Sequence, residues 1–180
     1  MKKLLTILLI ATSLSSMSQT TINPYTVCAN AIGEQYFVTN TPTSTYQWTV
    51  TGGGGALQTG QGTNSITVDW GGVSGLYPNA VEVIESNAAG CPGAPILLDV
   101  FVLLLSGNAI GPFCEGDPTT PLIGNPIGGT WSGTGVIANA FQPSAAGIGN
   151  HVLTYTMAGC STTINVTINN GPVTGPIQHF

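Results

Sequence analysis

The sequence has almost no side-chain cations. Lys2 and Lys3 are the only Lys or Arg residues among 180, against seven Asp and Glu residues. Neutralisation of phosphates by Lys and Arg dominates the affinity of proteins for nucleic acids, and the same side chains attract proteins to anionic membranes. The composition therefore argues against nucleic-acid partners and against binding to an anionic lipid surface.

The sequence also has few groups that could perform catalysis. Covalent catalysis needs a nucleophile, a base and an orienting group within hydrogen-bond reach. The two histidines, His151 and His179, fall at the expected start of a strand and in the C-terminal tail, and the carboxylates are scattered through turns and strand ends. We therefore predict no catalytic residues, no cofactor and no enzymatic activity.

Long apolar runs are absent too. The longest near the N-terminus, at 4–14, follows Lys2 and Lys3 and is shorter than the about 20 residues that a membrane-spanning helix needs. Small residues at Ser16 and Ser18 fit the pattern before a cleavage site. We predict a signal peptide over 1–18, export of the remaining chain to the cell surface, the medium or the periplasm, and no membrane insertion of the mature protein.

Glycine and proline are abundant, with 25 and 12 residues, and helical periodicity is missing. These residues cluster between short β-branched and aromatic runs, which is typical of many short strands. Tyr46, Trp48 and Val50 alternate with polar residues, as in a strand with one buried face. The predicted strands are 35–39, 46–51, 65–70, 80–86, 96–105, 129–132, 140–142, 151–156 and 162–168.

Four cysteines divide the chain into two similar units. Cys28 and Cys91 bracket Trp48, whereas Cys114 and Cys160 bracket Trp131. A tryptophan packed on a disulfide is typical of immunoglobulin-type sandwiches.

This pattern predicts an all-β fold, two tandem immunoglobulin-like β-sandwich modules after a cleaved signal peptide. The predicted boundaries are 19–105 for the first module, 106–112 for a linker, 113–170 for the second module, and 171–180 for a tail or the start of a further linker.

The cysteines allow three pairings. If each module holds its own disulfide, the bonds are Cys28–Cys91 and Cys114–Cys160, and both tryptophans pack against them. A zinc site is the alternative for four cysteines, but no Cys-x-x-Cys pair is present.

Other candidate sites are few. Glu115 and Asp117 follow Cys114 in an expected turn and are the candidate calcium ligands, although calcium takes six to eight oxygens. Trp70 and Tyr77 are the candidate ligand contacts, because an exposed tryptophan can stack on a sugar ring. The run 52–55 is interpreted as a flexible hairpin tip, and the YPNA sequence that starts at Tyr77 as a turn.

Several longer motifs resemble known modules. The first unit resembles the PKD-like domain repeated in exported proteins of Bacteroidetes bacteria, and the second resembles the immunoglobulin-like repeat that often follows it. The matching stretches are YQWTVTGGG at 46–54, GTNSITVDWGG at 62–72, FCEGDPTTPL at 113–122, GGTWSGTGV at 128–136 and FQPSAAGIGNHVLTY at 141–155.

The resemblance implies a role in cell-surface and secreted proteins, including adhesins linked to gliding motility and type IX secretion. We therefore predict a non-enzymatic surface, adhesion or spacer protein whose partner is a protein or a glycan at a cell surface. A carbohydrate-binding accessory module is one alternative. The other is the N-terminal fragment of a larger type IX-secreted adhesin, because the tail 171–180 resembles a linker that would open a third module.

Overall fold

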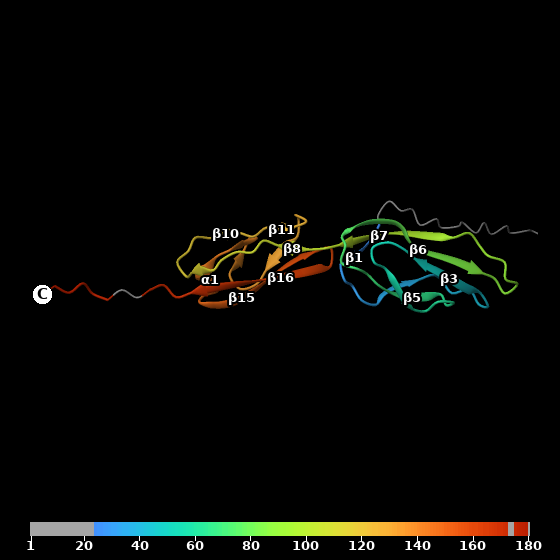
Figure 1. Ribbon diagram of the computed structural model, residues 1–180, viewed down its shortest axis with the longest axis horizontal. Helices are drawn as coiled ribbons and strands as arrows, with labels where there is room; N and C mark the ends of the chain where they lie inside the picture. Colours follow the sequence, from blue (N-terminus) through green and yellow to red (C-terminus); the bar gives the residue numbers. More distant parts are fainter. Residues whose placement is uncertain (1–23, 173–174, 180) are drawn as a thin grey trace, which may run out of the picture.

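The computed structural model describes residues 24–172 and 175–179, which form two β-sandwich modules placed end to end (Figure 1). The predicted signal peptide, 1–18, lies outside the described residues. No helix among the described residues is long and apolar enough to cross a membrane. The predicted fold class is confirmed.

Module one contains the strands β1 to β7 in two sheets. One sheet has the order β1-β7-β6-β3 and the other has the order β2-β5-β4. The strands are β1 (Tyr25–Cys28), β2 (Glu34–Phe37), β3 (Thr45–Val50), β4 (Ala56–Thr59), β5 (Ser65–Asp69), β6 (Gly75–Ser86) and β7 (Ile96–Leu103).

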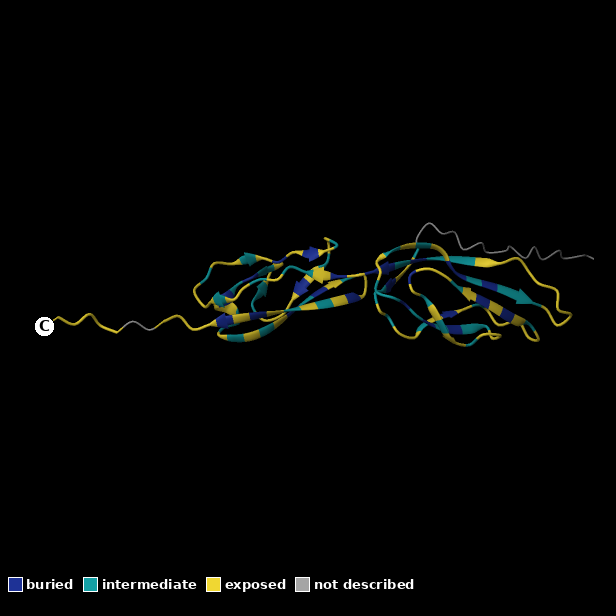
Figure 2. Cartoon of the chain, viewed as in Figure 1, coloured by how far each residue is buried: buried dark blue, intermediate teal, exposed yellow. Residues whose placement is uncertain are grey.

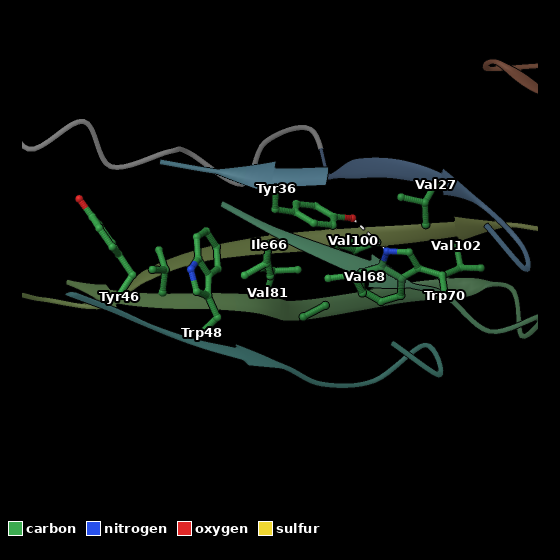
Figure 3. Packing of buried hydrophobic residues seen from close by; sticks show 12 residues of the cluster. Val27, Tyr36, Tyr46, Trp48, Ile66, Val68, Trp70, Val81, Val100 and Val102 are labelled. Atoms are coloured by element: carbon green, nitrogen blue, oxygen red, sulfur yellow. Dashed lines mark hydrogen bonds between the residues drawn. The ribbon is translucent and has the colours of Figure 1, made fainter. Parts of the chain in front are cut away.

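The core of module one lies between these sheets. Tyr46 and Trp48 of β3 are buried while Gln47 and Thr49 are exposed, so the predicted alternation is confirmed. Figure 2 shows buried and exposed residues alternating along the strands. Figure 3 shows Trp48 pointing towards the opposite sheet, where Tyr36, Ile66 and Trp70 lie, with Tyr46 at the edge of the cluster. The buried members of the cluster are Val27, Tyr36, Tyr46, Trp48, Ile66, Val68, Trp70, Ala80, Val81, Val83, Val100 and Val102.

The YPNA sequence is part of a strand. It lies within β6, where the pairing with β7 shifts register between Tyr77 and Val81. Asn79 has a positive φ of 53°, and its backbone N–H donates to Asp99 Oδ1 at 2.8 Å. The prediction of a turn was wrong because a bulge absorbs the turn-like residues without ending the strand.

Module two is built from shorter strands. A four-stranded sheet, β12-β15-β16-β9, faces the β8–β11 pair and a β10-β14-β13 sheet. The elements are β8 (Ser106–Gly107), β9 (Phe113–Cys114), β10 (Thr120–Pro121), β11 (Gly124–Asn125), β12 (Thr130–Ser132), β13 (Val136–Ile137), β14 (Ala140–Phe141), α1 (Pro143–Ala146), β15 (Gly149–Met157) and β16 (Cys160–Asn169).

Both modules begin and end in the same way. The first strand pairs in parallel with the last: β1 with β7, where Cys28 is opposite Leu103, and β9 with β16, where Cys114 is opposite Asn169. The last strand in each case is the second arm of an antiparallel pair, β6–β7 or β15–β16. The tandem organisation expected from the cysteine spacing is therefore present in the strand pairing.

The predicted linker at 106–112 is not a linker, because module two already begins before it. Ser106 and Gly107 form β8, which pairs with β11 of module two. Leu103 and Leu105 already belong to the hydrophobic cluster of module two, and Leu104 between them is 48% exposed. The modules are thus joined directly at the end of β7, because apolar residues on both sides of Leu104 are buried in the second core.

Candidate functional site

The most distinctive site is a disulfide between the two modules. Cys28, the last residue of β1, is bonded to Cys160, the first residue of β16, with a Cα–Cα distance of 5.5 Å and 132 residues of sequence separation. Cys160 is buried in the core of module two, and Cys28 packs against that same cluster. The bond therefore crosses the junction between the modules.

The predicted pairing Cys28–Cys91 was wrong because the parallel pairing of β1 and β7 separates these residues. Cys28 lies opposite Leu103 at the end of β7, whereas Cys91 precedes Ile96 at its start. At about 3.3 Å per residue, the seven steps of β7 span roughly 23 Å. A disulfide requires Cα atoms within about 7 Å of each other.

The same geometry rules out Cys114–Cys160. Cys114 lies opposite Asn169 at the end of β16, and Cys160 is the residue that begins β16. Nine residue steps of strand separate the two ends, roughly 30 Å. The two other cysteines, Cys91 and Cys114, are both in the described part of the chain and are free and exposed.

Trp131 lies in the core beside this junction. It is 4% exposed and belongs to the same cluster as Cys160 and Leu105. Its ring packs against Tyr155, with the ring centroids 5.1 Å apart, and a Cβ on Gly107 would collide with its six-membered ring. The predicted burial of Trp131 is confirmed, but the disulfide nearby is Cys28–Cys160.

The predicted ligand contacts lie in the core of module one or against it. Trp70 is 4% exposed, and its Nε1–H donates to the Tyr36 hydroxyl at 3.0 Å (Figure 3). Tyr77 is half-buried and its hydroxyl donates to the Val73 carbonyl at 3.0 Å. The period-2 pattern of β5 continues through Trp70, so its ring turns into the core and the expected stacking surface does not exist.

The glycine run 52–55 is packed beneath these rings. A Cβ on Gly53 would lie 3.0 Å from Tyr77 Cδ2 and 3.1 Å from Trp70 Cε3, and the Gly71 N–H donates to the Gly53 carbonyl at 2.9 Å. The run is therefore a close-packed turn, and the interpretation as a flexible tip was wrong.

The candidate calcium ligands do not form a cluster. Asp117 Oδ2 accepts the Cys114 backbone N–H at 2.8 Å, and the Asp117 N–H donates to the Cys114 carbonyl at 3.1 Å. The Asp117 carboxylate thus closes its own turn beside the exposed Glu115. Among the residues that the structure describes, no group of three or more His, Cys, Asp or Glu side chains could hold a metal ion.

The histidines take structural positions. His151 Nε2 lies 2.8 Å from the Gly147 carbonyl, at the end of α1, and His179 is exposed in the tail. Burial raises the pKa of Tyr36, and burial followed by the neighbouring Glu34 raises the pKa of Tyr25. The hydroxyls of Tyr36 and Tyr25 therefore stay protonated and neutral at physiological pH.

Module one contains a cavity of about 400 Å³ that was not predicted from the sequence. It lies at the edge where β2 and the first residues of β7 face each other, and its walls include the side chains of Trp48 and Val83. Tyr25 and Phe37 are 45% and 74% exposed at its rim. Because the two rims come from different sheets, no single stretch of sequence could have indicated it.

One family model matches the part of the chain that contains most of module one. Residues 15–98 match the model described as a PKD-like domain. Module one is thus similar to PKD-like domains, in agreement with the motifs. No curated protein matches the chain.

Several solved structures of multidomain proteins are similar to this chain. The extracellular domains 3–5 of Drosophila OTK align over 83% of this chain and 59% of theirs, with 13% identity and a TM-score of 0.37. The fibronectin(III)-like modules of Clostridium thermocellum CbhA align over 90% of this chain and 98% of theirs, with 12% identity and a TM-score of 0.33. Domains A168–A170 of titin align over 86% and 65%, with 13% identity and a TM-score of 0.30. Similarities of this size carry no information on ligands.

Proposed function

We propose that this protein is a non-enzymatic exported spacer of the surface or adhesion class, in which two β-sandwich modules act as one unit. Folds of the immunoglobulin and PKD-like type are typical of extracellular adhesion and spacer modules, and disulfides persist in oxidising compartments. Its place is the cell surface or the medium, and its partner is a protein or a glycan there. The motif resemblance extends this proposal to the gliding-motility and type IX adhesins of Bacteroidetes bacteria.

The observation that carries the proposal is the position of the Cys28–Cys160 bond. The chain enters module one along β1 and leaves module two along β16, and the bond connects these two strands directly. Tension applied to the two ends of the chain therefore passes from β1 through the sulfur atoms to β16. All residues between Cys28 and Cys160 are bypassed, so the strands β2 to β7 of module one are shielded from the pull.

A stretching experiment tests this role. The chain is held by handles at both ends and pulled in the oxidised and reduced states, in a C91S/C114S background that removes the free thiols. A fully extended chain spans about 3.4 Å per residue, so the bond should withhold up to roughly 450 Å of extension over its 132-residue separation. A C28S/C160S variant is the matched control and should release this length without reductant. Equal extension with and without the bond would refute the proposed role.

Glycan binding remains the second candidate, at a different place from the one the sequence indicated. Trp70 is buried, whereas Tyr25 and Phe37 expose aromatic faces at the rim of the module-one cavity. Aromatic faces are the usual platform for sugar rings. Binding to a glycan array that is lost in F37A and kept in I127A, an equally exposed apolar position in module two, would favour this candidate.

A further inference from the structure

The two free cysteines occupy the same structural positions as the two bonded ones. Cys28 and Cys114 are each the last residue of a module's first strand, opposite the end of the last strand. Cys91 and Cys160 each follow a glycine with φ near +80°; Cys160 is the first residue of the last strand, and Cys91 lies in the connection that leads into it. Each module thus carries two cysteines at its opposite ends. One is at the end of the first strand (the first-strand cysteine), and the other is in or beside the hairpin that leads into the last strand (the hairpin cysteine).

The bond that is present follows a rule of connection. The first-strand cysteine of module one, Cys28, is joined to the hairpin cysteine of the module that follows, Cys160. Applied once more, the rule joins Cys114 to the hairpin cysteine of a module placed beyond the end of β16. It likewise joins Cys91 to the first-strand cysteine of a module placed before module one.

Cys91 and Cys114 of one molecule are too far apart to form a disulfide with each other. Cys91 lies in the β6–β7 connection at the end of module one that is remote from module two, and Cys114 lies beside the end of β16 where the tail departs (Figure 1). The strands β7 and β16 lie between these points, and each is roughly 23 to 30 Å long. The distance is many times the reach of a disulfide.

We propose that Cys114 of one molecule forms a disulfide with Cys91 of a second copy, so that the protein grows head to tail into a covalent chain of modules. Each bond would repeat the Cys28–Cys160 arrangement between molecules. A head-to-tail contact of this kind leads to an open filament unless the rotation between successive copies closes it into a ring. Because the pairing uses one thiol from each end, every added copy leaves a free Cys91 and a free Cys114.

The redox balance is that of thiol–disulfide exchange. The two thiols lose two protons and two electrons to a small-molecule or protein disulfide, for example oxidised glutathione, which is reduced to two thiols. This proposal rests on the proposed export in one respect: an exported protein meets the oxidant that disulfide formation needs. An experiment that supplies the oxidant separates the two proposals.

The proposed Cys114–Cys91 disulfide should hold two copies together, because few apolar side chains would be buried between them. At the junction within the chain, Leu103 and Leu105 are buried in the next module. At the equivalent end of β16, Asn169 and Asn170 are exposed and polar. Reductant should therefore return the assembly to monomers.

The test mixes two single variants. C91S keeps only Cys114 free and C114S keeps only Cys91 free, and both retain the Cys28–Cys160 bond. In a glutathione redox buffer, the mixture should give a dimer linked through Cys114–Cys91, at well above the half share that random pairing of two thiols gives. The parent should give a ladder of oligomers on non-reducing gels, and C91S/C114S should stay monomeric.

Two results would overturn the proposal. One is a mixture in which Cys91–Cys91 and Cys114–Cys114 dimers form as readily as the mixed dimer. The other is a parent that remains monomeric in the same buffer while a small thiol-reactive probe labels both cysteines. Force measurements on the monomeric double variant test the spacer role independently of either result.

Discussion

Cys28, at the end of the first strand of module one, is covalently bonded to Cys160, at the start of the last strand of module two. The bond connects the two hydrophobic cores, because Val27 beside Cys28 is buried in the first and Cys160 is buried in the second. Two modules that could have been independent are thereby closed into one covalent ring. The fold alone gives two sandwiches, and this pair of residues makes them one unit.

Peptide mapping of the monomer under non-reducing conditions should find one disulfide and two thiols. Cleavage after Glu and Asp places the four cysteines on separate peptides, since acidic residues at 34, 85, 99 and 115 lie between them. Trypsin is unsuitable because the chain has no Lys or Arg after Lys3. The peptide that ends at Glu34 should be linked to the one that begins at Gly116. Recovery of a Cys28–Cys91 peptide pair would contradict the structure.

Removing the bond should destabilise both modules. The chain-entropy relation gives about 5 kcal/mol for closing a ring with 132 residues of separation, which is the expected upper limit of the loss in the C28S/C160S variant. The control is C91S/C114S, whose replaced thiols are free and exposed and which should change the free energy of unfolding by less than about 0.5 kcal/mol. Equal stability of the two variants in urea titrations would show that the junction is held without the bond.

Nine of the strands could be predicted from the sequence, but β1, which carries Cys28, and the disulfide could not. Alternation within β3 and β5 depends on neighbouring residues of one strand, so it is visible in the sequence. The pairing of Cys28 depends on which strand lies beside β1 and in which direction it runs. Once β1 is parallel to β7, Cys28 and Cys91 fall at opposite ends of the module, and no sequence spacing records this.

The candidate ligand contact Trp70 failed although the local alternation indicated burial. Trp70 follows the last residue of β5 and lies next to two glycines, which suggested an exposed ring. The ring is buried because the alternation of β5 places it on the core side, where the Tyr36 hydroxyl accepts its N–H. The cavity rimmed by Tyr25 and Phe37 arises from two sheets that meet in space and has no sequence signal.

Module one should lose stability in alkaline solution, above pH 10. Burial raises the pKa of Tyr36 above the unfolded value near 10, so the unfolded state releases its proton at a lower pH than the folded state. The contribution is fully present below pH 10 and is lost as the pH rises towards the folded pKa. The Y36F variant should show a flatter decline of the unfolding free energy between pH 9 and pH 11, measured in the C91S/C114S background to exclude thiol titration.

Neutral-pH data on the same variant give a second check. Y36F leaves the Trp70 Nε1–H buried without its acceptor, so it should cost about 1–3 kcal/mol at pH 7. Y25F is the matched control, because the half-exposed Tyr25 also has a raised pKa but accepts no such bond. If the pH curves of Y36F and the parent run parallel, the buried phenol does not govern the alkaline transition.

Trp131 should be the residue whose truncation most weakens module two. It is 4% exposed, and it fills the space between Tyr155 and Gly107, where a Cβ would already collide. Replacement of a buried tryptophan by alanine costs about 3–5 kcal/mol, which lowers the melting temperature of a small domain by roughly 12 °C or more. The W131F variant should lose clearly less, because it keeps an aromatic ring and because Nε1 of Trp131 has no acceptor among the described residues. Calorimetry on W131A, W131F and the parent checks this order. If W131A melts within a few degrees of the parent, the tryptophan does not hold the second core together, and the other members of the cluster carry its stability.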